Sequence, residues 1–123
     1  MDDLTIVIID DEALITEVLK AFIERRGDTV YDFNDASTAL SFIEQHYKEI
    51  HAVVTDYKMP GPINGGDVYR CIKTTYPTIV CYVITGYMDV MNNDIDDNFI
   101  VDKPIDFNTF LPKLYDSITK NER

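Results

Sequence analysis

The sequence is poor in cysteine, in basic residues and in long apolar runs, and each shortage excludes a class of protein. Cys71 and Cys81 are the only cysteines in 123 residues, too few for a disulfide scaffold and without the spacing of metal ligands. Eleven lysines and arginines stand against 22 aspartates and glutamates, so the net charge of −11 repels the phosphates of nucleic acids. We therefore expect no direct contact with DNA or RNA.

Segments that would lead the chain into a membrane or out of the cell are also missing from the sequence. No apolar run approaches the roughly 18 residues that cross a bilayer. The first residues, MDDLTIVIIDDE, lack the basic stretch that opens a signal peptide. The composition is that of a globular domain, with 46% hydrophobic and 27% charged residues. We expect a small cytoplasmic domain without membrane association.

Strand-like and helix-like segments alternate along the chain. Short aliphatic and β-branched runs predict five strands, at Leu4–Ile9, Thr29–Phe33, Ala52–Thr55, Thr78–Thr85 and Phe99–Val101. Apolar residues at helical spacing predict four clear helices, at Glu12–Arg26, after Asp35 or Ser37, after the loop Tyr57–Gly66, and at Phe107–Ile118. Met88–Asp97 is rich in Asn and Asp, so a helix there is expected to be short or irregular. The alternation predicts a parallel α/β sheet with helices on both faces.

Polar residues follow the predicted strands at the edge where open parallel sheets have their functional crevice. They are Asp10 and Asp11 after the first strand, Asp56 after the third, Thr85 at the end of the fourth and Lys103 after the fifth. Three ionised carboxylates need a counter-charge, which Lys103 supplies in part and Mg²⁺, a cation that prefers oxygen ligands, would complete. Together these groups can hold a phosphoryl group while a carboxylate attacks it.

The sequence resembles the receiver domains of two-component response regulators, which have a flavodoxin-like fold. The motifs that carry the resemblance lie in the family's order, as IVIIDDE (Ile6–Glu12), VVTDYKMPG (Val53–Gly61), VITG (Val83–Gly86) and VDKP (Val101–Pro104). The resemblance implies one receiver domain over residues 1–123, either stand-alone or part of a longer protein, with the strand order 2-1-3-4-5. It also implies phosphorelay signalling, in which the domain catalyses only its own phosphorylation and dephosphorylation.

The resemblance further implies a phosphoacceptor and a magnesium site. Asp56 would accept the phosphoryl group from the phosphohistidine of a sensor histidine kinase or of a phosphotransfer protein. Asp11 and Asp56 would bind Mg²⁺ directly, Asp10 through water, and the backbone carbonyl of Lys58 would be a further ligand.

Other residues would contact the phosphoryl group or take part in the conformational change that follows phosphorylation. Lys103 would pair with a phosphoryl oxygen, aimed by a cis Lys103–Pro104 peptide bond, and the Thr85 hydroxyl would move to the phosphoryl group as the first step of the switch. Receiver domains often have Tyr or Phe three residues before this lysine. Here that residue is Ile100, with Phe99 one position earlier, so which of the two takes the switch role stays open.

The segment between Lys73 and Lys103 is strongly acidic. It contains no lysine or arginine but includes Asp89, Asp94, Asp96, Asp97 and Asp102. In receiver domains, the region around residues 85–115 forms much of the output face. We therefore expect a basic downstream protein to bind there, with solubility as the alternative explanation for the charge and with a homodimer also open.

Three other interpretations fit parts of the pattern. A phosphotransferase of the haloacid-dehalogenase type also uses an aspartate after a strand, but it needs a second aspartate where this chain has Lys58. A flavodoxin-like cofactor binder needs a first loop rich in Ser, Thr or Gly, whereas the DDEAL loop repels phosphate. A degenerate receiver, acting as an interaction scaffold without phosphorylation, stays open because the switch region departs from the family pattern.

Overall fold

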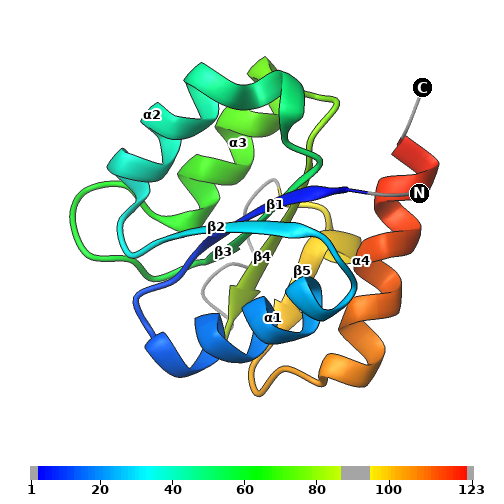
Figure 1. The fold of residues 1–123 in the computed structure, drawn as a ribbon. Helices are drawn as coiled ribbons and strands as arrows, with labels where there is room; N and C mark the ends of the chain where they lie inside the picture. Colours follow the sequence, from blue (N-terminus) through cyan, green and yellow to red (C-terminus); the bar gives the residue numbers. More distant parts are fainter. Residues whose placement is uncertain (1–2, 87–94, 122–123) are drawn as a thin grey trace.

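The chain forms one five-stranded parallel sheet covered by helices (Figure 1). The structure is a computed structural model that describes residues 3–86 and 95–121. Its strands and α-helices are β1 (Thr5–Ile9), α1 (Ala13–Arg25), β2 (Thr29–Phe33), α2 (Ala36–His46), β3 (Ala52–Asp56), α3 (Gly65–Thr75), β4 (Val80–Thr85), β5 (Ile100–Asp102) and α4 (Phe107–Asn121). The strand order β2-β1-β3-β4-β5 confirms the fold expected from the sequence.

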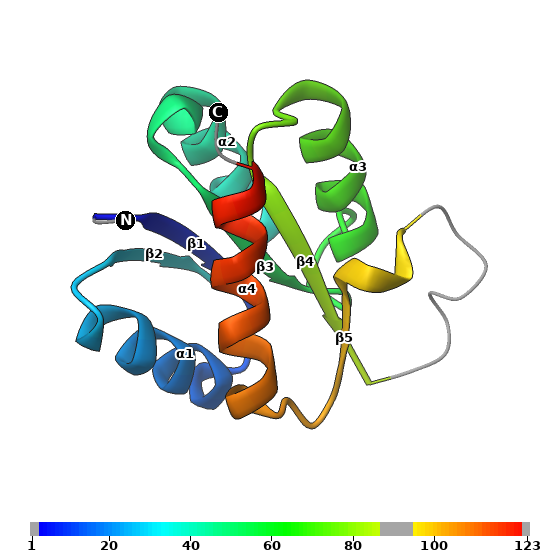
Figure 2. The same cartoon turned by 90° about the vertical axis from the view of Figure 1, so that its right-hand side faces the viewer.

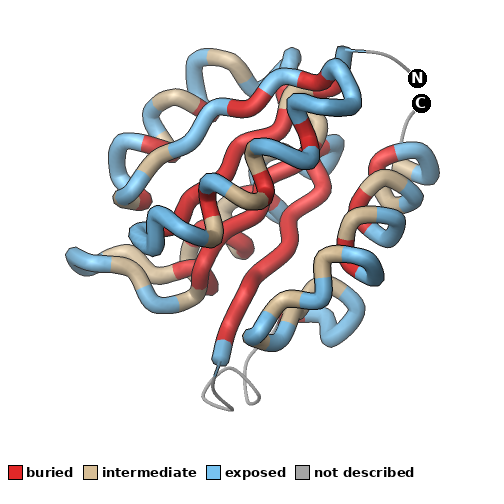
Figure 3. Tube along the Cα trace, turned by 60° about the horizontal axis from the view of Figure 1, so that its bottom comes forward, coloured by how far each residue is buried: buried red, intermediate tan, exposed pale blue. Residues whose placement is uncertain are grey.

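The sheet separates two apolar cores, each closed by a pair of helices. Helices α1 and α4 pack on one face, and α2 and α3 pack on the other (Figure 2). In β1, Ile6 and Ile8 enter the first core while Val7 enters the second, because successive side chains of a strand point to opposite faces. All residues of β3 and β4 are buried, which explains why both strands are apolar until their polar carboxyl ends (Figure 3).

The ends of the elements agree closely with the sequence signals, and the differences have local causes. The Asp35 side chain caps α2 by accepting a hydrogen bond from the Thr38 amide at 2.8 Å. Strand β4 begins at Val80 rather than Thr78, because the Ile79 amide donates to the Tyr76 carbonyl and closes a turn.

The sequence predicts that Phe99 begins the fifth strand, but in the structure this strand begins at Ile100. Phe99 ends a 3₁₀ turn, Asp97–Phe99, in which its amide donates to the carbonyl of Asp96 at 2.8 Å. The weak helix expected at Met88–Asp97 falls mainly on residues 87–94, outside the described residues. No helix in the described parts of the chain is both long enough and apolar enough to cross a membrane.

Helix α4 is fastened to the amino-terminal edge of the sheet by the carboxylate of Asp28. This residue is only 7% exposed, and its two carboxylate oxygens accept hydrogen bonds from the Leu4 amide and the Tyr115 hydroxyl, each at 3.0 Å. The guanidinium of Arg26 lies 3.8 Å from the centre of the Tyr115 ring. Burial, and then the contact with Asp28, raise the pKa of Tyr115 to about 12.

Candidate functional site

Three carboxylates meet at the carboxyl edge of the sheet. Asp10 directly follows β1 and Asp56 ends β3, and these two strands are hydrogen-bonded neighbours. One oxygen from each of Asp10, Asp11 and Asp56 lies within 4.8 Å of the other two. Asp10 and Asp56 are buried, whereas Asp11 is exposed. The fold therefore brings together the three carboxylates that the sequence analysis selected.

Asp10 carries an unsatisfied oxygen in this cluster. Its Oδ1 accepts a hydrogen bond from the Glu12 amide at 2.8 Å, but its buried Oδ2 has no hydrogen-bond partner among the described residues. Burial raises the pKa of Asp10 to about 7, and the nearby charge of Asp56 adds to the rise. A buried, unpaired carboxylate oxygen beside two other carboxylates is a donor set that fits a hard divalent cation such as Mg²⁺.

Lys103 balances part of this negative charge. Strand β5 positions it, since the Lys103 amide donates to the carbonyl of Thr85 at 3.0 Å, and its peptide bond to Pro104 is cis. The Nζ atom lies 3.2 Å from Oδ1 of Asp56 and 2.5 Å from Oε1 of Glu12. Burial favours a lower pKa for Lys103, but these two carboxylates outweigh it and raise the pKa. For Asp56, burial raises the pKa and Lys103 opposes the rise.

Glu12 is the residue of this site that the sequence analysis did not select. In the sequence it stands out only as part of the motif and as the start of a helix, although its side chain forms the shorter of the two ion pairs of Lys103. The available signal was its place directly after Asp11, in the loop that leaves β1 at the same sheet edge. The pair with Lys103 joins residues 91 positions apart, so only the folded chain reveals it.

The remaining predicted residues line a cavity of about 720 Å³ next to Asp56. Thr85, 3% exposed, ends β4 on its wall, and Lys58 lines the same cavity after β3. On the other side the cavity continues into an apolar groove between α1 and the start of α4. The lining residues of this groove are Leu14, Ile15, Val18, Ile105 and Phe107.

Gly65 allows α3 to begin directly against the strand that carries Asp56. A β-carbon at Gly65 would lie 2.4 Å from the Asp56 carbonyl oxygen and 2.7 Å from the Cα of Tyr57. Both neighbours are backbone atoms, so neither can move aside cheaply. A side chain at Gly65 would therefore disturb the backbone of Asp56.

Only part of the expected output face lies in the described residues. Asp96, Asp97 and Asp102 are exposed there, whereas Asp89 and Asp94 fall outside the described residues. Phe99 is half-buried against Tyr82, with ring centres 5.0 Å apart.

Comparisons with known proteins agree with this geometry. The family model of the response regulator receiver domain matches residues 6–114. The transcriptional regulatory protein HptR of Staphylococcus aureus is 42% identical over 87 residues, which are 68% of this chain and 32% of that protein. The chain thus spans about a third of the length of the curated relatives it matches.

Solved structures show the same fold. A response regulator receiver domain protein from Clostridium thermocellum has a TM-score of 0.81 at 25% identity, covering 95% of both chains. A receiver protein from Sinorhizobium medicae has a TM-score of 0.85 at 22% identity, covering 98% of both chains, and supports the fold alone. The strand order, the carboxylate cluster and the family match lead to one conclusion: the chain belongs to the receiver domains of two-component response regulators, whose general role is phosphorelay signalling and not that of a conventional enzyme.

Proposed function

We propose that this receiver takes a phosphoryl group from a phosphohistidine onto Asp56, with Mg²⁺, and that the modification changes its partner-binding face. The observation that supports this most directly is the surroundings of Asp56. Its carboxylate lies 3.2 Å from the ammonium group of Lys103 and shares a 4.8 Å cluster with two other carboxylates beside an open cavity. This arrangement provides a nucleophile, a counter-charge and room for a donor.

The proposed reaction is an in-line displacement at phosphorus. A carboxylate oxygen of Asp56 forms a bond to phosphorus while the bond from phosphorus to the imidazole nitrogen breaks, and the electron pair stays on that nitrogen. Asp11, Asp56 and the carbonyl of Lys58 would bind Mg²⁺ directly, and Asp10 would act through water. When bound, the metal would neutralise charge on the phosphoryl oxygens.

Lys103 and Thr85 would stabilise the transferred group. In the present structure Lys103 bridges Glu12 and Asp56, so it has to turn toward a phosphoryl oxygen once Asp56 is modified. Thr85 would then donate its hydroxyl to another phosphoryl oxygen. Fixed charges act more strongly than a neutral hydroxyl in a partly dehydrated site, so we assign the larger catalytic contribution to Lys103 and the metal.

The phosphodonor protein would dock on the apolar groove beside Asp56. The Leu14 side chain is 74% exposed, and Ile15 and Val18 continue its apolar surface along α1. Exposed apolar residues next to a reactive group favour a protein donor, such as a histidine kinase or a phosphotransfer protein. We expect Leu14→Asp to slow transfer from a purified histidine phosphotransfer protein while leaving labelling by acetyl phosphate unchanged. Equal slowing with both donors would contradict this docking site.

On the output side, we propose that the acidic residues Asp96, Asp97 and Asp102 contribute to binding a basic downstream protein in the cytoplasm. Their exposed carboxylates would accelerate encounter with such a protein through long-range attraction. Changing Asp96 and Asp97 to Asn together should weaken binding to this partner, with a loss that shrinks as salt is added.

The test of the central proposal is direct phosphorylation. The chain is incubated with Mg²⁺ and acetyl phosphate, and its intact mass is compared with that of Asp56→Asn. We expect one added phosphoryl group on the unaltered chain alone, and none when the metal is chelated before the donor is added. Labelling of both chains would assign the acceptor to another residue. Absence of both labelling and Mg²⁺-dependent beryllofluoride binding would favour the degenerate scaffold.

A further inference from the structure

Strand β5 is shorter than its neighbour, so part of β4 has no strand partner on the β5 side, although its residues are buried. Strand β3 pairs with β4 from Val80 to Ile84, but β5 pairs with β4 only from Val83 to Thr85. Within residues 3–86 and 95–121, no strand pairs with Val80–Tyr82 on the β5 side. This edge is a different surface from the phosphoacceptor site.

The main-chain groups of Cys81 are directed toward this open side. The Val80 amide donates to the His51 carbonyl on the β3 side, whereas the Thr85 carbonyl accepts from the Lys103 amide on the β5 side. Main-chain groups of successive strand residues alternate between the two sides, so Cys81 has the same orientation as Thr85. Its amide and carbonyl therefore face the side on which an added strand would lie.

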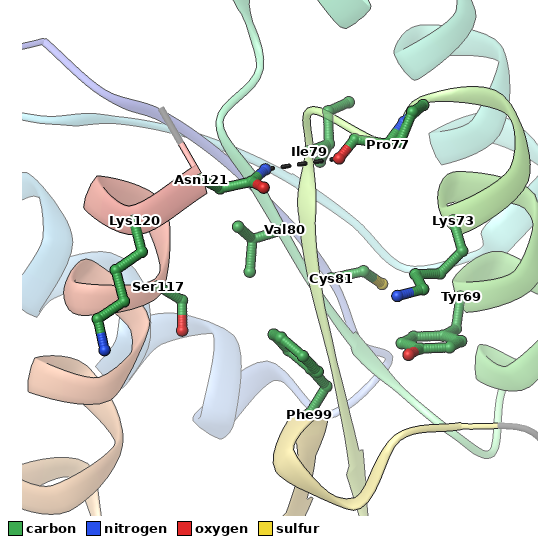
Figure 4. Close-up of a pocket in the computed structure, with 10 residues that line it drawn as sticks. All are labelled: Tyr69, Lys73, Pro77, Ile79, Val80, Cys81, Phe99, Ser117, Lys120 and Asn121. Atoms are coloured by element: carbon green, nitrogen blue, oxygen red, sulfur yellow. Dashed lines mark hydrogen bonds between the residues drawn. The ribbon is translucent and has the colours of Figure 1, made fainter. Parts of the chain in front are cut away.

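A groove of about 260 Å³ lies along this part of β4, between α3 and α4 (Figure 4). Figure 4 shows β4 in the middle, with Tyr69 and Lys73 of α3 on one side and Ser117 and Lys120 of α4 on the other. Its apolar lining residues are Pro77, Ile79, Val80, Cys81 and Phe99. The three residues of β4 from Val80 to Tyr82 span about 10 Å, enough for a short extended segment that ends where Phe99 packs against Tyr82.

The charge of the groove identifies the kind of segment that fits it. Among the described residues, its lining includes Lys73 and Lys120, from opposite walls, and no aspartate or glutamate. This is unusual on a chain with twice as many acidic as basic residues. Lys120 pairs with Asp116 at 3.1 Å, but both side chains are largely exposed, so exchanging this partner costs little. The groove is therefore complementary to carboxylates on both sides of an apolar strand.

We propose that this groove binds an extended segment of a partner protein, in which carboxylates flank apolar residues, and that the segment adds a strand beside Val80–Tyr82. Main-chain hydrogen bonds to Cys81 would fix the segment, and the two lysines would select its charge. This interaction requires no phosphorylation, so it stands or falls independently of the role of Asp56.

A synthetic peptide, acetyl-Asp-Val-Thr-Val-Asp-amide, tests the proposal by ¹⁵N–¹H NMR. Its sequence reads the same in both directions, so the orientation of the added strand does not matter. We expect shifts of the amide signals of Lys73, Cys81 and Phe99, and slower hydrogen exchange at Cys81. A lysine-flanked peptide, and the same acidic peptide N-methylated at its three central residues, should bind more weakly. Equal binding of the lysine-flanked peptide, shifts confined to other surfaces, or no shifts would overturn the proposal.

Variants of the chain separate charge selection from general effects. Changing Lys73 and Lys120 together to Gln should weaken binding of the acidic peptide about threefold to tenfold. The matched control, Arg25→Gln with Lys48→Gln, removes the same charge from side chains that do not line the groove and should leave binding unchanged. An equal loss of peptide affinity in both double variants would show that only the net charge of the chain matters, and would overturn the assigned site. The Asp56→Asn chain should bind the peptide as well as the unaltered chain does.

Discussion

Replacing Asp10 by Asn should stabilise the metal-free domain, because the native fold holds this carboxyl group where ionisation is unfavourable. Burial first, and then the charge of Asp56, raise its pKa from 3.8 to about 7. An acid with a higher pKa in the folded chain destabilises the fold as pH rises, since the folded state retains a proton that the unfolded state has released. The loss develops between about pH 4 and pH 7.

The size of this effect follows from the shift in pKa. At about 1.4 kcal/mol per pKa unit, the shift sets a ceiling of about 4 kcal/mol on the loss of stability at neutral pH. Solvent at the open side of the site screens the charges, and the Asn amide gains no partner for its nitrogen, so we expect a gain of about 1–2 kcal/mol for Asp10→Asn at pH 8. For a chain of this length, that is a rise in Tm of roughly 4–8 °C.

Thermal unfolding followed by circular dichroism at pH 5 and pH 8, with a metal chelator, measures this gain. Asp35→Asn is the matched control, because hydrogen bonds from the amide and hydroxyl of Thr38 lower the pKa of Asp35 and make its charge stabilising, so this change should bring no gain. Mg²⁺ should stabilise the unaltered chain more than Asp10→Asn. The reasoning fails if Asp10→Asn is no more stable than the unaltered chain at pH 8, or if its gain is the same at both pH values.

Two further substitutions test the packing that supports the site. Gly65→Ala should lower the free energy of unfolding by about 2–3 kcal/mol and reduce labelling by acetyl phosphate, because its β-carbon would lie 2.4 Å from the Asp56 carbonyl oxygen. Gly66→Ala is the control, since its β-carbon would meet only side-chain atoms, at 3.2 Å or more. Denaturant unfolding of both variants gives the comparison. Tyr115→Phe should cost about 1–2 kcal/mol at neutral pH by removing the hydrogen bond to Asp28. Because the pKa of Tyr115 is raised from 10.0 to about 12, the unaltered chain should also lose stability from pH 10 upward, and Tyr115→Phe should lose less in a pH series.

The sequence carries enough information for the sheet and for the line of polar residues along its edge. The apolar runs of β1 and β3 are typical of strands buried on both faces, and parallel topology then places Asp10 and Asp56 side by side. Lys103 could be added because it directly follows a strand in the VDKP motif.

Contacts that depend on the direction of side chains cannot be predicted from the sequence. The bridge from Lys103 to Glu12 and the buried Asp28–Tyr115 hydrogen bond each join distant parts of the chain, and no periodicity encodes them. The 3₁₀ turn at Phe99 could not be predicted either. The Phe99 amide donates to the Asp96 carbonyl, so Phe99 belongs to the turn and not to the strand that follows it. Local signals therefore predict the elements, whereas packing decides which charges meet.

The part of β4 without a strand partner also bears on how the domain behaves in concentrated solution. Unpaired strand edges are templates for association between molecules, and a short edge between two helices promotes such association less strongly than a long one. The net charge of −11 keeps copies apart over the screening length, about 10 Å at 0.1 M salt. At 1 M salt this length falls to about 3 Å, and the repulsion no longer reaches from one molecule to the next. Colloidal stability of this receiver thus depends on its acidity, and self-association should increase with ionic strength.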